Sequence, residues 1–384
     1  MTLPATSHGT LARGYATGEA AQAVRDLLRQ LDRQLAGRRA EVVLYFASAV
    51  HDPAALAGPI AAHFPDACVL GCSSAGEFTD SVTATGGVSA VVLPEGIVVR
   101  AVAALGDLSE DAAGGTDATV AEIEAALGRP LRELDQSRYL GLVLMDGVHG
   151  VEQLASERLI AAAPGLDVVG GSAGDDLRFD RTWVAVGDRI SEFGLALVIC
   201  EVAVPFRVLR TCSYHPSGRT LQITRTDADG GTVLELDGRP AVDAYADAVG
   251  VAPADLNSQV WSRHPLGMVV DGNRWISGPV AIAPGGGLVF RNRLPAGAEA
   301  DVMDPGDLVA DTASAIERAR AALGGQVSGA VAFNCILRRL EMDARHAEAD
   351  FVLALGGVPT AGFHAYGETW LGHVNQTLTA VVFG

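Results

Sequence analysis

The residues best placed to do chemistry belong to three short motifs that each end in glycine and a carboxylate. They read GCSSAGE at 71–77, VGGSAGD at 169–175 and GFHAYGE at 362–368. Each motif follows an apolar stretch of β-prone residues, which predicts a tight turn at the end of a strand. Backbone N–H groups in such turns can bind a carboxylate or a phosphate, and three turns together would line one cavity. The alternative is that their small residues only allow strand and helix to pack closely.

The third motif carries the densest polar set. His364 and Tyr366 take the place of small residues, and the strand expected before it ends in Asn334-Cys335-Ile336-Leu337-Arg338. Arginine offers a bidentate fork for a carboxylate, and Glu368 could hold an ammonium group, so the set suits an amino-acid-like ligand. A structural ion pair is the alternative role for Arg338. The predicted ligand-binding residues are Asn334, Cys335, Arg338, His364, Tyr366, Gly367, Glu368 and Asn375, with Ser73, Ser74 and Glu77 from the first motif.

Two other chemistries stay open. GCSSA at 71–75 is one residue from the GxSxG nucleophile elbow, so Ser73 or Cys72 could serve a hydrolase, but the second motif has Gly171 opposite Ser73 and no spacing defines a triad. We therefore expect a protein without enzymatic activity. No cofactor is certain, and haem is the one to consider because it needs only an axial histidine and an apolar pocket. The histidines beside predicted strand ends are His215, His264, His364 and His373.

Composition excludes several classes of protein. All 28 basic residues are arginine, which rules out a Walker A loop and a pyridoxal imine because both need lysine. The formal net charge of −18 makes nucleic acid or an anionic membrane a poor partner. Five cysteines without CxxC spacing give no structural zinc site. No apolar run reaches the roughly 20 residues of a membrane span and no secretory signal opens the sequence, so we expect a cytoplasmic protein.

The elements that must position the motifs recur with them. Glu77 and Asp175 are 98 residues apart, as are His51 and His149. In each copy a first strand precedes a helical stretch, and the strand that leads into the motif follows. These first strands are predicted at 42–48, 140–146 and 329–334, where they end in Ser48, Asp146 and Asn334. The chain is therefore built from one repeated strand-helix-strand-turn unit with two polar positions, one after each strand.

Alternating strands and helices predict an α/β (α+β layered) fold with mixed sheets covered by helices in two domains. Apolar residues at helical spacing over 15–36 predict an amphipathic helix, which makes 1–37 a helical lead-in. Turn signals within 215–240 place the domain boundary near 220. The domains are thus 38–220 with two repeats and 221–384 with the third repeat at 328–384.

With these residues in view, the chain resembles the FIST-domain proteins, named for F-box and intracellular signal transduction. The resemblance covers nearly the whole chain, as a FIST N-type domain at 38–220 and a FIST C-type domain at 221–384. It rests on GCSSAGEF at 71–78, VVGGSAGDD at 168–176, HPLG at 264–267, FNCILR at 333–338, GFHAYGE and the closing HVNQTLTAVVFG at 373–384.

The resemblance implies a sensory role in signal transduction, with amino acids among the ligands proposed for the family. It implies a separate signalling partner, a histidine kinase, a chemotaxis protein or a cyclic-dinucleotide protein, and some family members are haem-binding nitric oxide sensors. Our leading hypothesis is a cytoplasmic small-ligand sensor in which Arg338 binds an anionic group, Asn334 and Asn375 orient the ligand, and Glu368 and Tyr366 bind its polar or cationic end. A haem-based nitric oxide sensor and a hydrolase are the alternatives, and self-association into a homo-oligomer stays open.

Overall fold

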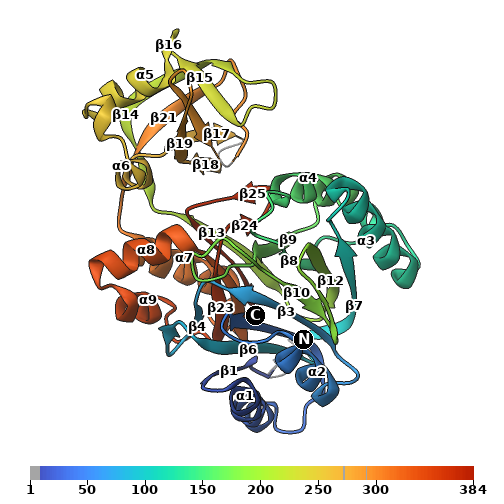
Figure 1. Cartoon of the computed structure of the whole chain (residues 1–384). Helices are drawn as coiled ribbons and strands as arrows, with labels where there is room; N and C mark the ends of the chain where they lie inside the picture. The colour runs from blue at the N-terminus through green and yellow to red at the C-terminus, as the bar shows by residue number, and fades with distance from the viewer. Residues whose placement is uncertain (1–8, 271–272, 291) are drawn as a thin grey trace. The chain divides into compact units, whose positions relative to one another are not determined.

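The computed structural model describes residues 9–270, 273–290 and 292–384, which form two compact units (Figure 1). The first unit comprises the chain up to Thr211 together with Val309–His373 and Thr377–Gly384. The second unit comprises Cys212–Leu308 and Val374–Gln376. With 29% helix and 40% strand in mixed sheets, the structure confirms the predicted α/β class.

The first unit consists of three repeats with the order strand-helix-strand-helix followed by four strands, and the third repeat has one extra helix before its four strands. The first repeat contains β1 (Ala12–Thr17), α1 (Ala20–Leu35), β2 (Ala40–Ser48), α2 (Ala54–His63), β3 (Cys68–Ser74), β4 (Glu77–Thr79), β5 (Thr83–Ala84) and β6 (Gly87–Pro94). The second contains β7 (Val98–Asp107), α3 (Ala112–Leu127), β8 (Tyr139–Met145), α4 (Glu152–Ala162), β9 (Val168–Ser172), β10 (Val184–Val186), β11 (Arg189–Ser191) and β12 (Gly194–Val202). The third contains β13 (Phe206–Cys212), α7 (Leu308–Ala322), β22 (Gly329–Cys335), α8 (Ile336–Arg345), α9 (Glu348–Ala354), β23 (Thr360–Ala365), β24 (Glu368–Thr369), β25 (His373–Val374) and β26 (Thr377–Phe383). The repeated unit predicted from the motifs is confirmed, and each copy is longer than the sequence pattern indicated.

The helix expected at 15–36 is α1, and it belongs to the first repeat. Its buried residues Ala23, Val24, Leu27, Leu31 and Leu35 recur at helical spacing, and Ala36 ends it in the left-handed conformation. The residues before it do not continue the predicted helical lead-in, because Ala12–Thr17 alternates in burial and pairs antiparallel with β6. Helix α1 therefore occupies in the first repeat the place that α3 occupies in the second.

Each sheet of the first unit is completed by a strand from a different repeat (Figure 1). Two parallel strands of one repeat lie side by side within it, β2 with β3, β8 with β9, or β22 with β23. The short strand after each glycine-containing turn leaves that sheet. Strand β4 pairs antiparallel with β23, β10 with β3, and β24 with β9. The exchange is cyclic, so no repeat completes its own sheet.

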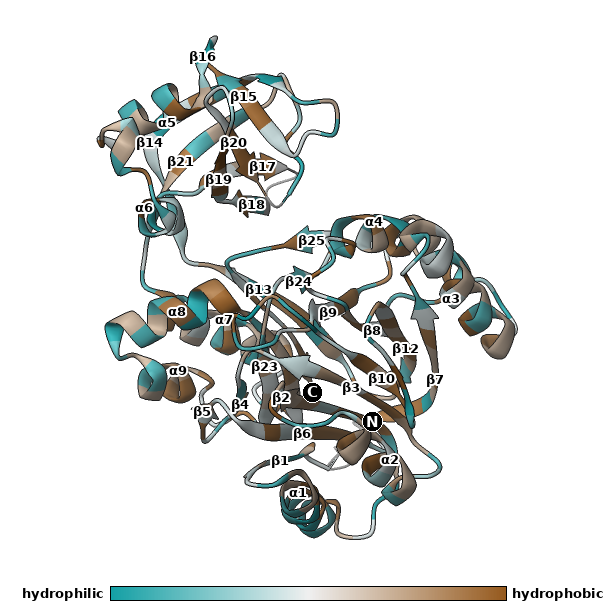
Figure 2. Ribbon diagram, viewed as in Figure 1, coloured by the Kyte–Doolittle hydropathy of each residue, from teal (hydrophilic) through white to brown (hydrophobic). Residues whose placement is uncertain are grey.

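The inner faces of these sheets share one apolar core. Phe46 of β2 lies 6.2 Å from Phe333 of β22 and 4.8 Å from Phe363 of β23 between ring centroids, and Leu142 of β8 belongs to the same cluster. On the outer faces, α1 and α2 cover the first sheet, α3 and α4 cover the second, and α8 contacts β22 and β23. Figure 2 shows the central strands largely in the brown of hydrophobic residues. Burial on both faces explains why these strands are apolar runs rather than alternating ones.

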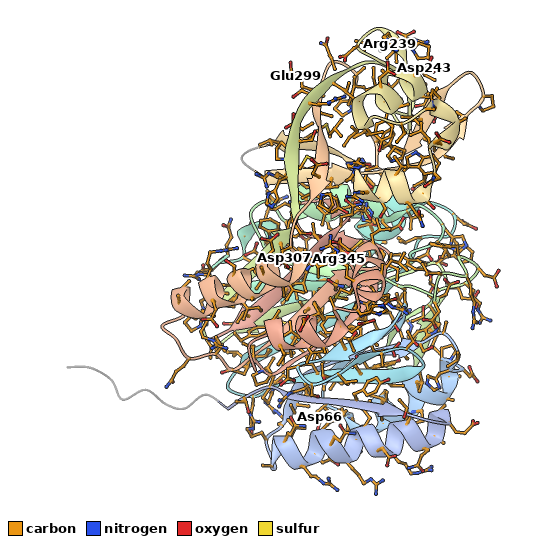
Figure 3. The ribbon with its side chains drawn as sticks, turned by 90° about the vertical axis from the view of Figure 1, so that its left-hand side faces the viewer. Asp66, Arg239, Asp243, Glu299, Asp307 and Arg345 are labelled. Carbon is orange, nitrogen blue, oxygen red and sulfur yellow. The ribbon has the colours of Figure 1, made fainter. Side chains whose placement is uncertain are left out.

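The second unit is inserted between β13 and α7. The corresponding strand-to-helix connection comprises only residues 18–19 in the first repeat and 108–111 in the second, so the insertion extends a surface loop. Its described residues form an eight-stranded sheet with two α-helices, and Figure 3 labels the charged residues Arg239, Asp243 and Glu299. Its elements are β14 (Tyr214–Thr226), β15 (Thr232–Leu236), β16 (Arg239–Pro240), α5 (Ala241–Val249), α6 (Ser258–Arg263), β17 (Leu266–Val270), β18 (Asn273–Ser277), β19 (Pro279–Ala283), β20 (Gly287–Phe290) and β21 (Glu299–Pro305).

The division into units differs from the predicted domains. A boundary near 220 would place the third repeat, 328–384, in one domain with residues 221–327. The structure groups it with the first two repeats instead, because β22 and β23 share the apolar core with β2, and β23 pairs with β4.

A substitution at Gly170 of β9 tests how closely the parallel strands β8 and β9 approach each other. A Cβ atom at this position would lie 1.8 Å from the carbonyl oxygen of Val143 on β8, whereas a Cβ at Gly58 of α2 would meet nothing within 4 Å. We expect Gly170→Ala to lower the free energy of unfolding by about 3 kcal/mol or more, because the strand must shift. Gly58→Ala should raise it by about 0.5–1 kcal/mol. Urea unfolding measures both, and equal effects would contradict the register of β8 with β9.

Candidate functional site

The three glycine-containing turns contact one another. A backbone hydrogen bond links each pair, so these N–H groups satisfy the fold and are not available to an anion. This matches the close-packing alternative for the motifs. The bonds are Ala75 N to His364 O (3.0 Å), Gly174 N to Ser73 O (3.1 Å) and Tyr366 N to Ser172 O (3.1 Å).

Several predicted ligand residues form a buried hydrogen-bonded chain in the third repeat. Arg338, 1% exposed, donates from Nε to Asn334 Oδ1 at 2.8 Å and from Nη2 to Thr312 Oγ1 at 2.7 Å. Asn334 Nδ2 donates to His364 Nδ1 at 2.9 Å. The imidazole proton therefore stands on Nε2, which donates to Thr83 Oγ1 at 2.9 Å. The chain links α7, β22, β23 and β5, so it connects the third repeat to the first.

The charge states in this chain are fixed by burial. Burial, together with the nearby Arg339 and Arg338, lowers the pKa of His364 from 6.5 to about 3, so the imidazole is neutral. With both nitrogens bonded to the protein, His364 does not fit an axial haem ligand.

Two of the motif carboxyls are buried as well. Glu77 accepts hydrogen bonds from Ser74 Oγ and from Gly87 N (3.0 Å), and Glu368 accepts from Thr377 Oγ1 (2.6 Å). Burial raises the pKa of each carboxyl from 4.5 to about 8. Both are therefore protonated at neutral pH, and Glu368 is not a ready partner for an ammonium group.

The remaining residues predicted around the third motif also pack inside the protein. Cys335 and Tyr366 belong to a small apolar cluster with Ala75. Gly367 packs against His373, since a Cβ at Gly367 would lie 2.1 Å from the imidazole Cε1. Asn375 falls in the second unit, where its Nδ2 donates to Asn292 Oδ1 at 2.9 Å.

The proposed nucleophiles lie in β3. Ser73 Oγ accepts a hydrogen bond from Trp183 N at 3.1 Å. Burial raises the pKa of the Cys72 thiol well above its usual 9.0, so the thiolate is disfavoured. Neither side chain is hydrogen-bonded to a histidine among the described residues.

The other haem-ligand candidates differ in environment. His215 is exposed on β14, and His264 follows α6 with its Nδ1 3.0 Å from Asp304 Oδ1. His264 is the better fit for a metal ligand because ligating histidines usually bond a carboxylate through their other nitrogen. Across residues 9–270, 273–290 and 292–384, no group of three or more His, Cys, Asp or Glu side chains could hold a metal ion.

The second turn breaks the symmetry of the repeats. The first and third turns comprise only 75–76 and 366–367, whereas the second runs over 173–183 before β10 begins. We call 173–183 the long turn. Asp175 folds it back: its carboxylate accepts hydrogen bonds from Phe179 N (2.9 Å), Asp180 N (2.7 Å), Arg181 N (3.0 Å) and the Tyr366 hydroxyl. These bonds, chiefly the one from Tyr366, hold the pKa of Asp175 below its ordinary value against the cost of burial.

The long turn has an unusual backbone. Asp176, Leu177 and Phe179 have φ values of 56°, 66° and 53°, in a region that residues other than glycine rarely adopt. Asp176 accepts a hydrogen bond from Ser48 Oγ at 3.0 Å, and Phe179 stacks on Tyr366 with ring centroids 4.7 Å apart. Such conformations persist where surrounding contacts impose them, and they gather at ligand sites.

A cavity of about 430 Å³ lies between the long turn and the residues that follow β2. We call it the interrepeat cavity, since it joins the first and second repeats. Two arginines and three aspartates line it, together with one histidine and four apolar residues. Its lining is Ala49, Val50, His51, Asp52, Pro53, Asp175, Arg178, Asp180, Arg181 and Trp183.

None of the ligand-binding residues predicted from the sequence lines the interrepeat cavity. The sequence carried two signals for it, the match of His51 with His149 and the charged residues that follow the second motif. Neither signal showed that 173–183 forms a long turn against the end of β2, because that depends on β10 pairing with β3.

Comparison with known proteins identifies the class. A FIST N domain matches residues 41–239 and a FIST C domain matches 241–370. The chain belongs to the FIST family. FIST domains are sensor domains of signal transduction.

Curated relatives carry no assigned function. The chain is 30% identical over 243 residues to an uncharacterized protein of Mycobacterium tuberculosis, covering 60% of this chain and 62% of the relative. It is 31% identical over 156 residues to an uncharacterized protein of Mycobacterium bovis, covering 37% of this chain and 40% of the relative. The matched part therefore spans under two thirds of the relatives' length.

A solved chorismatase structure aligns over 99% of both chains at 8% identity and a TM-score of 0.34, which is too low to carry an argument. No helix in the described part of the chain combines the length and apolar character that a membrane span needs.

The buried carboxyls predict a pH dependence. Folded Glu77 keeps its proton up to about pH 8, whereas the unfolded chain loses it near 4.5, so stability falls as pH rises from 4.5 to 8. Glu77→Gln keeps an acceptor for Gly87 N and cannot ionise. Its stability relative to wild type should therefore increase across this window in urea unfolding. Parallel pH curves for Glu77→Gln and wild type would contradict the buried neutral carboxyl.

Proposed function

We propose that this protein is a cytoplasmic, non-enzymatic sensor that binds an amino-acid-like small molecule in the interrepeat cavity. The observation that carries the proposal is that two arginines and three aspartates line one cavity in a protein of net charge −18. A volume of about 430 Å³ is in the usual range for small-ligand sites, roughly 300–1,000 Å³. This site replaces the third-repeat set around Arg338, whose polar groups are occupied within the fold.

The lining offers complementary groups for a zwitterion. The guanidinium of Arg178 has no hydrogen bond or ion pair with any described residue, while Arg181 already pairs with Glu192 at 2.6 Å. Arg178 is therefore the fork available to a carboxylate. Among the described residues, the Asp180 carboxylate has no partner, and the Asp52 carboxylate accepts only one hydrogen bond, from Ala54 N at 3.1 Å. These two carboxylates suit an ammonium group.

The long turn gives ligand binding a route to a response. Its residues Arg178 and Asp180 line the cavity. Asp175 accepts a hydrogen bond from the Tyr366 hydroxyl, and Leu177 N donates one to it. A ligand that prefers one conformation of this turn would shift its population. A separate signalling protein, such as a histidine kinase, a chemotaxis protein or a cyclic-dinucleotide enzyme, would read that shift.

Isothermal titration of the 20 common L-amino acids into the full-length protein tests the site. Arg178→Gln should weaken binding of any ligand found by roughly 10-fold or more, since charged hydrogen bonds contribute about 1.5–3 kcal/mol. Arg189→Gln removes an arginine of β11 that does not line the cavity, and should leave affinity unchanged. Equal affinity of Arg178→Gln and wild type would reject the site.

A haem-binding nitric oxide sensor is the second candidate, and the His264–Asp304 pair favours it. Haem would supply the gas-binding iron, and His264 would hold it. After reconstitution with hemin, wild type should show a Soret band that His264→Ala loses and His215→Ala keeps. A flat visible spectrum of reconstituted wild type would reject this candidate.

A further inference from the structure

A second cavity, of about 610 Å³, lies beside the residues that precede β8 and β9. Its lining is 136–138, Asp167, 202–208 and Trp370, and it shares no residue with the interrepeat cavity. We call it the tryptophan cavity. The whole lining belongs to the first unit and comes from the second and third repeats. The volume is within the usual range for small-ligand sites, roughly 300–1,000 Å³.

The indole of Trp370 is held in place at this cavity. Its Nε1 donates to Asp167 Oδ1 at 3.1 Å, and the half-buried side chain packs against the apolar core that the three sheets share. The guanidinium of Arg210, which does not line the cavity, lies over the ring with its Cζ 6.0 Å from the ring centroid. An oriented, partly exposed indole is a surface on which a planar ring can stack.

The charged groups that line the tryptophan cavity are Arg138, Arg207 and Asp167. Arg138 already pairs with Glu201 at 2.5 Å, and Asp167 bonds the indole N–H. Arg207 is exposed, and its Nη1 donates to the carbonyl oxygen of the neighbouring Phe206 at 2.8 Å. Its guanidinium has no carboxylate partner within the part of the chain that the structure describes. Arg207 therefore offers a fork to a carboxylate or a phosphate.

The first repeat shows the same arginine position with its charge neutralised. Arg13 is the second residue of β1, as Arg207 is the second residue of β13. The Arg13 guanidinium donates to both carboxylate oxygens of Asp80, at 2.7 and 2.6 Å. Asp80 stands three residues after the carboxyl of its motif, a place that Leu371 takes in the third repeat. The third repeat therefore has no acid at the place that neutralises the arginine of the first.

We propose that the tryptophan cavity binds a small planar aromatic anion, whose ring stacks on Trp370 and whose carboxylate or phosphate pairs with Arg207. The apolar side chains of Val202, Val204 and Phe206 in the lining suit such a ring. This site is separate from the interrepeat cavity and does not depend on the proposed function. Aromatic carboxylates and nucleoside monophosphates share this chemistry, so one probe of each kind is needed.

Isothermal titration of phenylacetate and of adenosine monophosphate into the full-length protein tests the site. At least one of them should bind. Its neutral analogue, phenylacetamide or adenosine, should bind roughly 10-fold or more weakly, because the charged hydrogen bonds to the guanidinium are lost. If phenylacetate binds, cyclohexylacetate, which keeps the charge without a planar ring, should bind roughly 2- to 10-fold more weakly than phenylacetate.

Variants separate the two cavities. Arg207→Gln should weaken binding of the probe roughly 10-fold or more, whereas Arg178→Gln should leave it unchanged. Because Arg207 is exposed, Arg207→Gln should melt at the wild-type temperature. Leu371→Asp, which places an acid as in the first repeat, should also weaken binding, and the neutral Leu371→Asn should not. Stacking should quench tryptophan emission, and Trp370→Phe should lose that quenching.

Absence of binding by both probes to the folded protein would overturn the inference, as would equal affinity of Arg207→Gln and wild type. A probe whose binding depends on Arg178 instead of Arg207 would occupy the interrepeat cavity and would also overturn it. Amino-acid binding that does not depend on Arg178 would reject the proposed function and leave this inference intact.

Discussion

The cyclic exchange of short strands is the constraint on which the first unit depends. Strands β4, β10 and β24 each hydrogen-bond to a sheet of another repeat, so none of the three sheets is complete until all three repeats are in place. Edge N–H and C=O groups that would otherwise be unpaired are satisfied only in the assembled unit. Folding of the repeats is therefore coupled. The glycine-containing turn recurs in each repeat because it is where the chain passes from one sheet to the next.

This constraint explains why the polar residues of the third repeat are structural. The chain from Arg338 through Asn334 and His364 to Thr83 ends on β5, an element of the first repeat. The buried guanidinium is tolerated because it donates to Asn334 and Thr312 of its own repeat, and the buried neutral imidazole because it also bonds to Thr83 of the first repeat. Polar density alone does not separate a ligand site from such a chain, and only the partners in space decide between them.

The sequence made the local features predictable and left the long-range ones open. The glycine-carboxylate motifs and the 98-residue offset identified the repeat, and helical spacing identified α1. The pairing of β4 with β23 joins residues more than 280 positions apart, such as Phe78 and Gly362, and no periodicity in the chain encodes it. The turn signals within 215–240 belong to the second unit, but they could not show that the chain returns from it to complete the third repeat.

In a scaffold of three similar repeats, function is most readily accommodated where one repeat departs from the others. Two turns are short enough to pass straight from one sheet to the next, and their carboxyls, Glu77 and Glu368, are buried and neutral. The second turn has the shorter Asp175 at this position, and this carboxylate accepts the N–H groups of a longer loop instead of entering a strand. That one change keeps an ionised carboxylate inside the turn, and it accompanies left-handed conformations at three residues and a cavity beside His51. The first and third turns pass directly between sheets, so the long turn is the one of the three whose side chains line this cavity.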